Sequence, residues 1–171
     1  MALPHVARTS TQQAERRPAP RLRRAYYDCR YGQLHLHNAI PSGGGFDELT
    51  AVVCIHGQGE TGRAFLPLLG VLGYERSVYA PDMPGCGETD PAPGEAALDA
   101  SVNALGDFLD SMRIRSVDLL TLGQGQEIAQ RLVQLRGAGV RRVLHLSAAD
   151  MQSADLGRKL LAALGGGPLP T

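Results

Sequence analysis

Residues 117–132 read VDLLTLGQGQEIAQRL, and this stretch decides the fold. Its first six residues, Val117 to Leu122, are mostly apolar and predict a buried strand. Residues 126–135 follow with the spacing of a helix. Gly123 and Gly125 lie between the two, where glycine allows a backbone that other residues enter only under strain. The stretch therefore predicts a strand, a tight turn and a helix.

The same alternation continues on both sides of this unit. Ala51 to Ile55 is a continuous apolar run, which is typical of a strand covered on both faces. The full set of expected strands is 25–30, 32–38, 51–55, 77–80, 117–122 and 140–147, and the expected helices are 63–72, 95–112, 126–135 and 154–164. Strands that alternate with helices through short connections imply right-handed crossovers. The predicted fold class is α/β, a mainly parallel sheet with flanking helices.

Three segments, taken in order, resemble the α/β-hydrolase family. Residues 56–59, His-Gly-Gln-Gly, follow a buried strand and resemble the family's HG turn. Residues 80–90, APDMPGCGETD, are similar to its APDxPGxGxSD loop. Residues 117–132 look like its nucleophile elbow and the helix after it, where members commonly read VGHSMGGAIAQRL. The resemblance covers about residues 25–150 and implies an α/β-hydrolase-like core.

The resemblance places a glycine where the family keeps its nucleophile. Aligned on the Ile-Ala-Gln-Arg-Leu of residues 128–132, the family's G-x-S-x-G falls on Thr121, Gly123 and Gly125, a degenerate elbow. Glycine can keep the strained turn but removes the serine oxygen. The resemblance also implies an oxyanion-hole-like arrangement at the HG turn and the elbow, made by Gly57, Gln58 and Gln124. Serine-triad catalysis is therefore not expected.

No residue is a strong replacement for the missing catalytic groups. His56 is a weak candidate for a base, and the resemblance gives it a structural role in the turn instead. Asp150 follows the last predicted strand, where some family members carry an acid, but the last histidine, His145, lies inside that strand. Cys86 is a weak candidate nucleophile, because its acidic neighbours would raise the pKa of its thiol.

The chain is expected to divide into three parts. Residues 1–24 form a basic leader expected to be disordered, residues 25–150 form the core, and residues 151–171 form the start of a cap-like helix and a tail. On this interpretation the core lacks the family's C-terminal strands, and the sheet has an open edge. Such an edge has to be covered or paired, which favours a homodimer or a protein partner along it.

Composition limits the function classes. With 17 Lys and Arg against 17 Asp and Glu among 171 residues, the formal charge is zero, which argues against nucleic-acid binding. No apolar run is long enough for a membrane helix. The three cysteines show no metal-like spacing and indicate a reduced, cytoplasmic setting, although the Arg-rich leader also resembles an organellar targeting peptide. His35 and His37 alternate on one strand face without a third ligand, so a solvated face is expected, with no metal or cofactor.

Four functions remain open at this point. The leading hypothesis is a module that binds a small molecule or a protein partner. The second is a residual ester or lactone hydrolase that uses a water near Gly123 and the surviving amides. The third is a dinucleotide-binding domain, because residues 123–128 half match a glycine fingerprint, with Asp150 after the next strand; that reading leaves the HG turn unexplained. The fourth is the remnant of a truncated gene.

Overall fold

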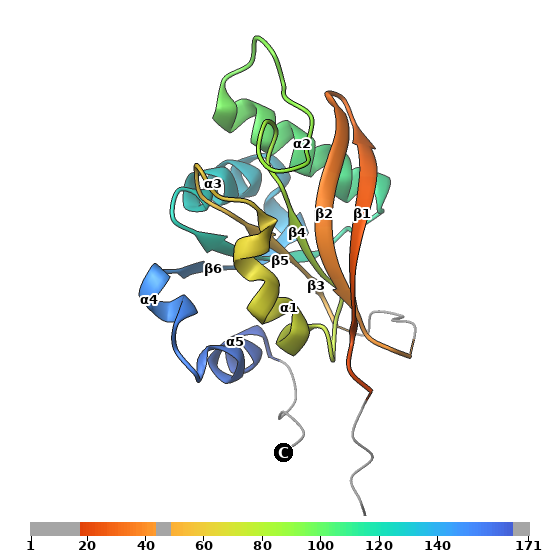
Figure 1. The fold of residues 1–171 in the computed structure, drawn as a ribbon. Coiled ribbons are helices and arrows are strands. Elements are labelled where there is room, and N and C mark those ends of the chain that lie inside the picture. The colour runs from red at the N-terminus through yellow and green to blue at the C-terminus, as the bar shows by residue number, and fades with distance from the viewer. Residues whose placement is uncertain (1–17, 44–48, 166–171) are drawn as a thin grey trace, which may run out of the picture.

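A six-stranded sheet runs through the centre of the molecule, with helices on both faces (Figure 1). The computed structural model describes residues 18–43 and 49–165. The strand order is β1-β2-β4-β3-β5-β6, with bounds β1 Arg21–Cys29, β2 Gly32–Ile40, β3 Ala51–Ile55, β4 Val78–Pro81, β5 Val117–Leu122 and β6 Val140–Leu146. The pairs β1–β2 and β2–β4 are antiparallel, and the remaining pairs are parallel. The mainly parallel α/β sheet expected from the sequence is therefore present.

The helices form one layer on each side of the sheet (Figure 1). Their bounds are α1 Leu66–Leu72, α2 Ala97–Ser111, α3 Gly125–Arg136, α4 Ala148–Met151 and α5 Leu156–Leu164, with short 3-10 turns η1 Gly62–Phe65 and η2 Gly137–Gly139. Successive strand residues point to opposite faces, so Val53 and Leu119 pack with α2 and α3, whereas Val52 and Leu120 pack with α1 and α5. Every residue of β3 and β5 is buried because both layers cover these strands.

One boundary of the expected division differs in the structure. Strand β1 begins at Arg21, so residues 21–24 belong to the sheet, where they pair with residues 37–40 of β2. The rest of the expected leader, apart from residues 18–20, lies outside the described residues. Helix α5 buries four leucines in the same cluster as α1. The expectation that it begins a cap stays a prediction. The expected tail at residues 166–171 lies outside the described part.

Strand β6 lies at one end of the sheet, next to β5. Within the described residues no further strand pairs with it, and three of its residues, Arg141, Arg142 and His145, are exposed. The homodimer or protein partner expected along such an edge stays a prediction. Among the helices of residues 18–43 and 49–165, none has the length and apolar character needed to cross a membrane.

Candidate functional site

A tight turn joins β5 to α3, where the resemblance to the family leads us to expect the nucleophile elbow. Gly123 adopts a left-handed conformation with φ +56°, and Gly125 begins the helix. A Cβ atom on Gly125 would lie 2.3 Å from the carbonyl oxygen of Ile55, so the helix start packs directly on the end of β3. A Cβ atom on Gly123 would meet nothing closer than the Cα atom of Gly57, at 3.9 Å. The position therefore has space for a side chain and carries none; we call this space the Gly123 slot.

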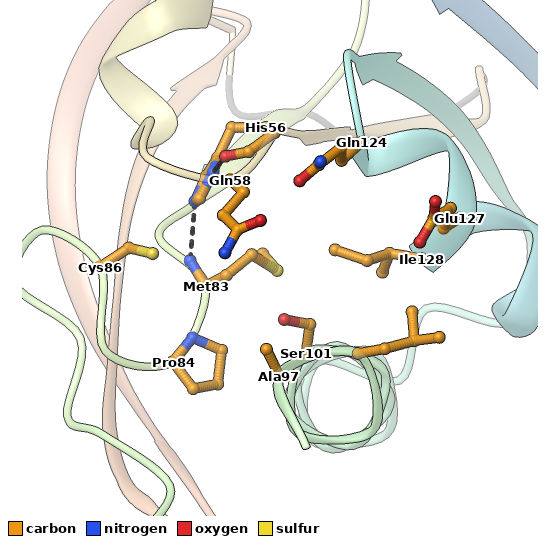
Figure 2. Close-up of a pocket in the computed structure, with 12 residues that line it drawn as sticks. His56, Gln58, Met83, Pro84, Cys86, Ala97, Ser101, Gln124, Glu127 and Ile128 are labelled. Atoms are coloured by element: carbon orange, nitrogen blue, oxygen red, sulfur yellow. Dashed lines mark hydrogen bonds between the residues drawn. The ribbon is translucent and has the colours of Figure 1, made fainter. Parts of the chain in front are cut away.

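His56 holds the HG turn in place. Its side chain is 1% exposed. Its Nδ1 lies 2.7 Å from the carbonyl oxygen of Gly57, and its Nε2 accepts a hydrogen bond of 2.9 Å from the backbone N–H of Met83 (Figure 2). Nδ1 must therefore carry the proton and donate it to Gly57. Both nitrogens are engaged, so the ring ties the HG turn to the loop after β4 and has no free lone pair with which to act as a base.

Two backbone amides lie where the HG turn meets the elbow, those of Gln58 and Gln124. A Cβ atom on Gly57 would lie 3.2 Å from the amide nitrogen of Gln124 and 3.2 Å from the carbonyl oxygen of Leu122, so the two turns touch at this glycine. Within the described part of the chain, the N–H groups of Gln58 and Gln124 donate to no protein acceptor. Two unengaged N–H groups that border one space can accept a carbonyl oxygen or a developing oxyanion between them.

Two cavities meet at Gln58 and Gln124. The first, which we call the apolar cavity, has a volume of about 170 Å³, and its wall includes Met83, Leu98 and Ile128. Figure 2 shows the side chains of Gln58, Met83 and Ile128 pointing into it, with Ala97 and Ser101 of α2 on the facing side. The second has a volume of about 470 Å³, and we call it the polar cavity because Glu60 and two glutamines line it. Its lining residues are Gly57, Gln58, Gly59, Glu60, Leu122, Gly123, Gln124 and Ala148.

Glu60 brings a carboxylate into the polar cavity, and the sequence analysis missed it. Its Oε2 accepts a hydrogen bond of 3.3 Å from the N–H of Gly57, while its own N–H donates to the carbonyl oxygen of Gly57 at 3.2 Å. Glu60 lines this cavity together with Gly123 and Gln124. The available signal was its place four residues after His56, inside the same turn, where a side chain can fold back on the backbone.

The other candidates from the sequence lie in different settings. Cys86 borders the apolar cavity, and burial, followed by the charge of Asp82, raises the pKa of its thiol, which opposes thiolate formation. Asp150 forms a capping box with Ser147 at the start of α4, with bonds of 2.8 Å and 3.1 Å. The backbone N–H of Ser147 is the main cause that lowers the pKa of the Asp150 carboxyl. Neither residue is arranged as a nucleophile or as an acid beside a histidine.

Thr121 and His145 pair with each other on neighbouring strands. The Oγ1 of Thr121 lies 2.5 Å from the Nδ1 of His145, in register across β5 and β6. Thr121 is only 1% exposed, and neither residue lines the apolar or the polar cavity. Among the described residues, no group of three or more His, Cys, Asp or Glu side chains could hold a metal ion.

The expected solvated face at His35 is wrong. His35 is 1% exposed because η1 and the loop after β4 cover this face of β2. Its Nε2 accepts a hydrogen bond from Arg24 at 3.0 Å, so its Nδ1 carries the proton and donates to Asp82 at 2.8 Å. Asp82 also accepts from the N–H groups of Gly62, at 2.7 Å, and Glu88, at 3.1 Å. Burial alone would raise the pKa of Asp82, but these hydrogen bonds outweigh it and leave the pKa below its ordinary value. Asp82 thus anchors the loop after β4 to the segment that follows the HG turn.

A family model described as the alpha/beta hydrolase family matches residues 52–170. The chain belongs to the alpha/beta hydrolase family. Membership accounts for the HG turn and for residues 80–90, which the dinucleotide-binding alternative leaves unexplained. A comparison with curated proteins found no match.

Solved structures show the same fold at low sequence identity. A variant epoxide hydrolase from Vigna radiata superposes with a TM-score of 0.64 and 18% identity over 74% of this chain and 39% of its own. An alpha/beta hydrolase from Novosphingobium aromaticivorans superposes with a TM-score of 0.65 and 19% identity over 72% of this chain and 43% of its own. The carboxylesterase CesB from Bacillus subtilis superposes with a TM-score of 0.62 and 17% identity over 72% of this chain and 42% of its own. The chain thus spans about two fifths of the length of these hydrolases, and the likeness concerns the fold alone.

Proposed function

We propose that this chain binds a small neutral carbonyl compound, such as an ester, a lactone or an amide, without forming a covalent acyl-enzyme. The observation that carries the proposal is the Gly123 slot. The elbow keeps its left-handed backbone and its open space, and the side-chain oxygen that would attack a carbonyl is replaced by hydrogen. The unengaged amides of Gln58 and Gln124 border the same space and supply the donors for a carbonyl oxygen.

The charges around the site favour a neutral ligand over an anion. Glu60 lines the polar cavity and Glu127 lines the apolar cavity, whereas no Lys or Arg among the described residues lines either one. His56, with Nε2 taken by Met83, contributes no free donor toward the cavities. A carboxylate ligand would be repelled by the two glutamates, while an uncharged carbonyl meets only the amide donors. The apolar cavity offers Leu98 and Ile128 for the body of the ligand.

Isothermal titration with a matched pair of compounds tests the role of the amides. The first compound is 4-nitroacetanilide, and the second is 1-nitro-4-propylbenzene, which has a similar shape but no carbonyl. We expect the anilide to bind at least about fivefold more tightly, because one hydrogen bond to the paired amides contributes about 1 kcal/mol or more. Equal affinity for the two compounds would contradict the proposed use of the amides.

Two leucine variants test the location of the ligand. Leu98 is partly buried in the wall of the apolar cavity, and Leu135 is 67% exposed on α3, outside both cavities. We expect Leu98→Asn to weaken the binding of 4-nitroacetanilide by about fivefold to tenfold, because it removes apolar contact area from the ligand. The matched control Leu135→Asn should bind like the unaltered protein. Unchanged binding by the Leu98 variant would place the ligand elsewhere.

A further inference from the structure

We propose that Glu60 acts as a general base that activates a water molecule in the Gly123 slot, which gives the chain a slow, non-covalent esterase activity. The inference rests on the proposed function, since its substrate is an ester held as the carbonyl ligand described above. It goes beyond that function because it assigns a reaction and a catalytic residue. The reaction uses no serine, no histidine and no acyl-enzyme.

The geometry brings a base, a water site and an oxyanion donor to one gap. The Oε2 of Glu60 accepts from the N–H of Gly57 at 3.3 Å, and the Cα atom of Gly57 lies 3.9 Å from the Cβ position of Gly123. Glu60, Gln58 and Gln124 all line the polar cavity. The Gly123 slot opens into the same cavity. A water that donates one hydrogen bond to Glu60 can therefore sit within reach of a carbonyl carbon whose oxygen is held by the amides.

Glu60 is free to take a proton, unlike the other candidate bases. In the described structure the Glu60 side chain accepts one hydrogen bond, from the N–H of Gly57 to Oε2 at 3.3 Å. Its Oε1 has no described partner and can accept from a water. By contrast, both nitrogens of His56 are engaged, and the Asp150 carboxylate caps α4.

The proposed step balances with water as the only co-reactant. Glu60 takes one proton from the water as the water oxygen bonds to the carbonyl carbon of the ester, and the carbonyl π electrons move to its oxygen. The resulting oxyanion is stabilised by the N–H groups of Gln58 and Gln124. The intermediate then collapses, the bond between the carbonyl carbon and the ester oxygen breaks, and the proton on Glu60 passes to the leaving alkoxide. The products are a carboxylic acid and an alcohol, and Glu60 is returned as a carboxylate.

The test compares turnover of 4-nitrophenyl acetate by the unaltered protein, Glu60→Gln and Glu88→Gln. The glutamine amide oxygen at position 60 can still accept from the N–H of Gly57, so the turn is kept while the base is lost. Glu88 is an exposed glutamate outside both cavities and serves as the matched control. Binding of 4-nitroacetanilide is measured on all three proteins, so that loss of the base is separated from loss of the site.

We expect Glu60→Gln to lose about a hundredfold in turnover, which is the lower range for a positioned general base. Its affinity for 4-nitroacetanilide should stay within about twofold of the unaltered protein, and Glu88→Gln should keep full turnover. Product release should show no initial burst, because no covalent intermediate forms.

Three results would overturn the inference. If Glu60→Gln kept the turnover of the unaltered protein, Glu60 would not be the general base. A burst of product in that variant would indicate a covalent nucleophile such as Cys86. An unaltered protein that binds 4-nitroacetanilide yet hydrolyses no ester would refute the base while leaving the binding proposal intact. Absence of both binding and turnover from a folded sample would instead refute the proposed function itself.

Discussion

Gly123 and Gly125 stand two residues apart on the same elbow, and their surroundings differ sharply. A Cβ atom on Gly125 would lie 2.3 Å from the carbonyl oxygen of Ile55 and 3.0 Å from that of His56. A Cβ atom on Gly123 would have 3.9 Å to its nearest neighbour. Gly125 belongs to a packed frame that holds the HG turn against the elbow, whereas Gly123 opens into an empty slot.

The frame and the slot also differ in how fully their hydrogen-bonding groups are paired. In the frame, both nitrogens of His56 are engaged, and Asp82 is bonded to His35 and to two backbone amides. In the slot, the amides of Gln58 and Gln124 have no described acceptor. The frame depends on packing and buried hydrogen bonds, and a side chain at Gly123 would contribute to neither. The frame can therefore hold the slot open whatever residue stands at position 123.

Alanine at the two glycines should give the largest contrast in stability. We expect Gly125→Ala to lower the free energy of unfolding by about 4 kcal/mol, because the methyl group meets backbone carbonyls that cannot move aside. Gly123→Ala should cost about 1 to 2 kcal/mol, the usual penalty for a left-handed backbone. Urea unfolding measures both. Similar losses for the two variants would mean that the frame and the slot are not distinct.

Removing the His56 ring should have the next largest effect. His56→Ala leaves the N–H of Met83 and the carbonyl oxygen of Gly57 buried without partners and also opens a cavity. We expect a loss of about 3 kcal/mol in the free energy of unfolding. The matched control His37→Ala, at a partly buried histidine whose ring makes no described hydrogen bond, should lose much less. If His56→Ala were as stable as the control, His56 would have a role other than holding the frame.

Asp82→Asn tests the frame by pH. We expect a loss of about 2 kcal/mol at pH 7, because asparagine cannot replace the charged acceptor of His35 and two amides. The pKa of Asp82 is lowered from 3.8, so its contribution is complete above that value and is lost as the pH falls through the lowered pKa. The gap between the two proteins should therefore narrow in acid. The control Asp155→Asn, at an exposed site, should have the same free energy of unfolding as the unaltered protein. A difference between Asp82→Asn and the unaltered protein that does not change with pH would contradict the role given to the Asp82 carboxylate.

Much of the fold could be predicted from local patterns. Two strands have the expected bounds, Ala51–Ile55 and Val117–Leu122. A short apolar run between turn residues is typical of a strand that is buried on both faces. The first strand was expected to begin at residue 25 but begins at Arg21, since pairing with β2 stabilises its polar residues and leaves no apolar signal in them. Helix α5 was expected as the start of a cap-like helix, and the sequence alone does not show that its leucines pack in one cluster with those of α1.

The parts of the site that depend on backbone conformation could be predicted from the sequence. The contacts of individual side chains could not. Gly123 was expected in a tight turn between a strand and a helix, and it lies in such a turn with φ +56°. Its assignment to the nucleophile position stays a prediction. His35 was expected on a solvated face, because alternation cannot show that Asp82, 47 residues away, covers it. Glu60 carries no periodic signal at all, and only its bond to Gly57 places its carboxylate in the polar cavity.

The most direct test of the central claim is an NMR titration that follows the backbone amides of Gln58 and Gln124 as 4-nitroacetanilide is added. If these N–H groups hold the ligand carbonyl, both amide protons should shift downfield together and saturate at the affinity measured by calorimetry. Amides in the frame, such as that of Met83, should shift far less because they are already engaged. Saturable binding that leaves the Gln58 and Gln124 amides unchanged would contradict the claim that the empty elbow is a carbonyl-binding site.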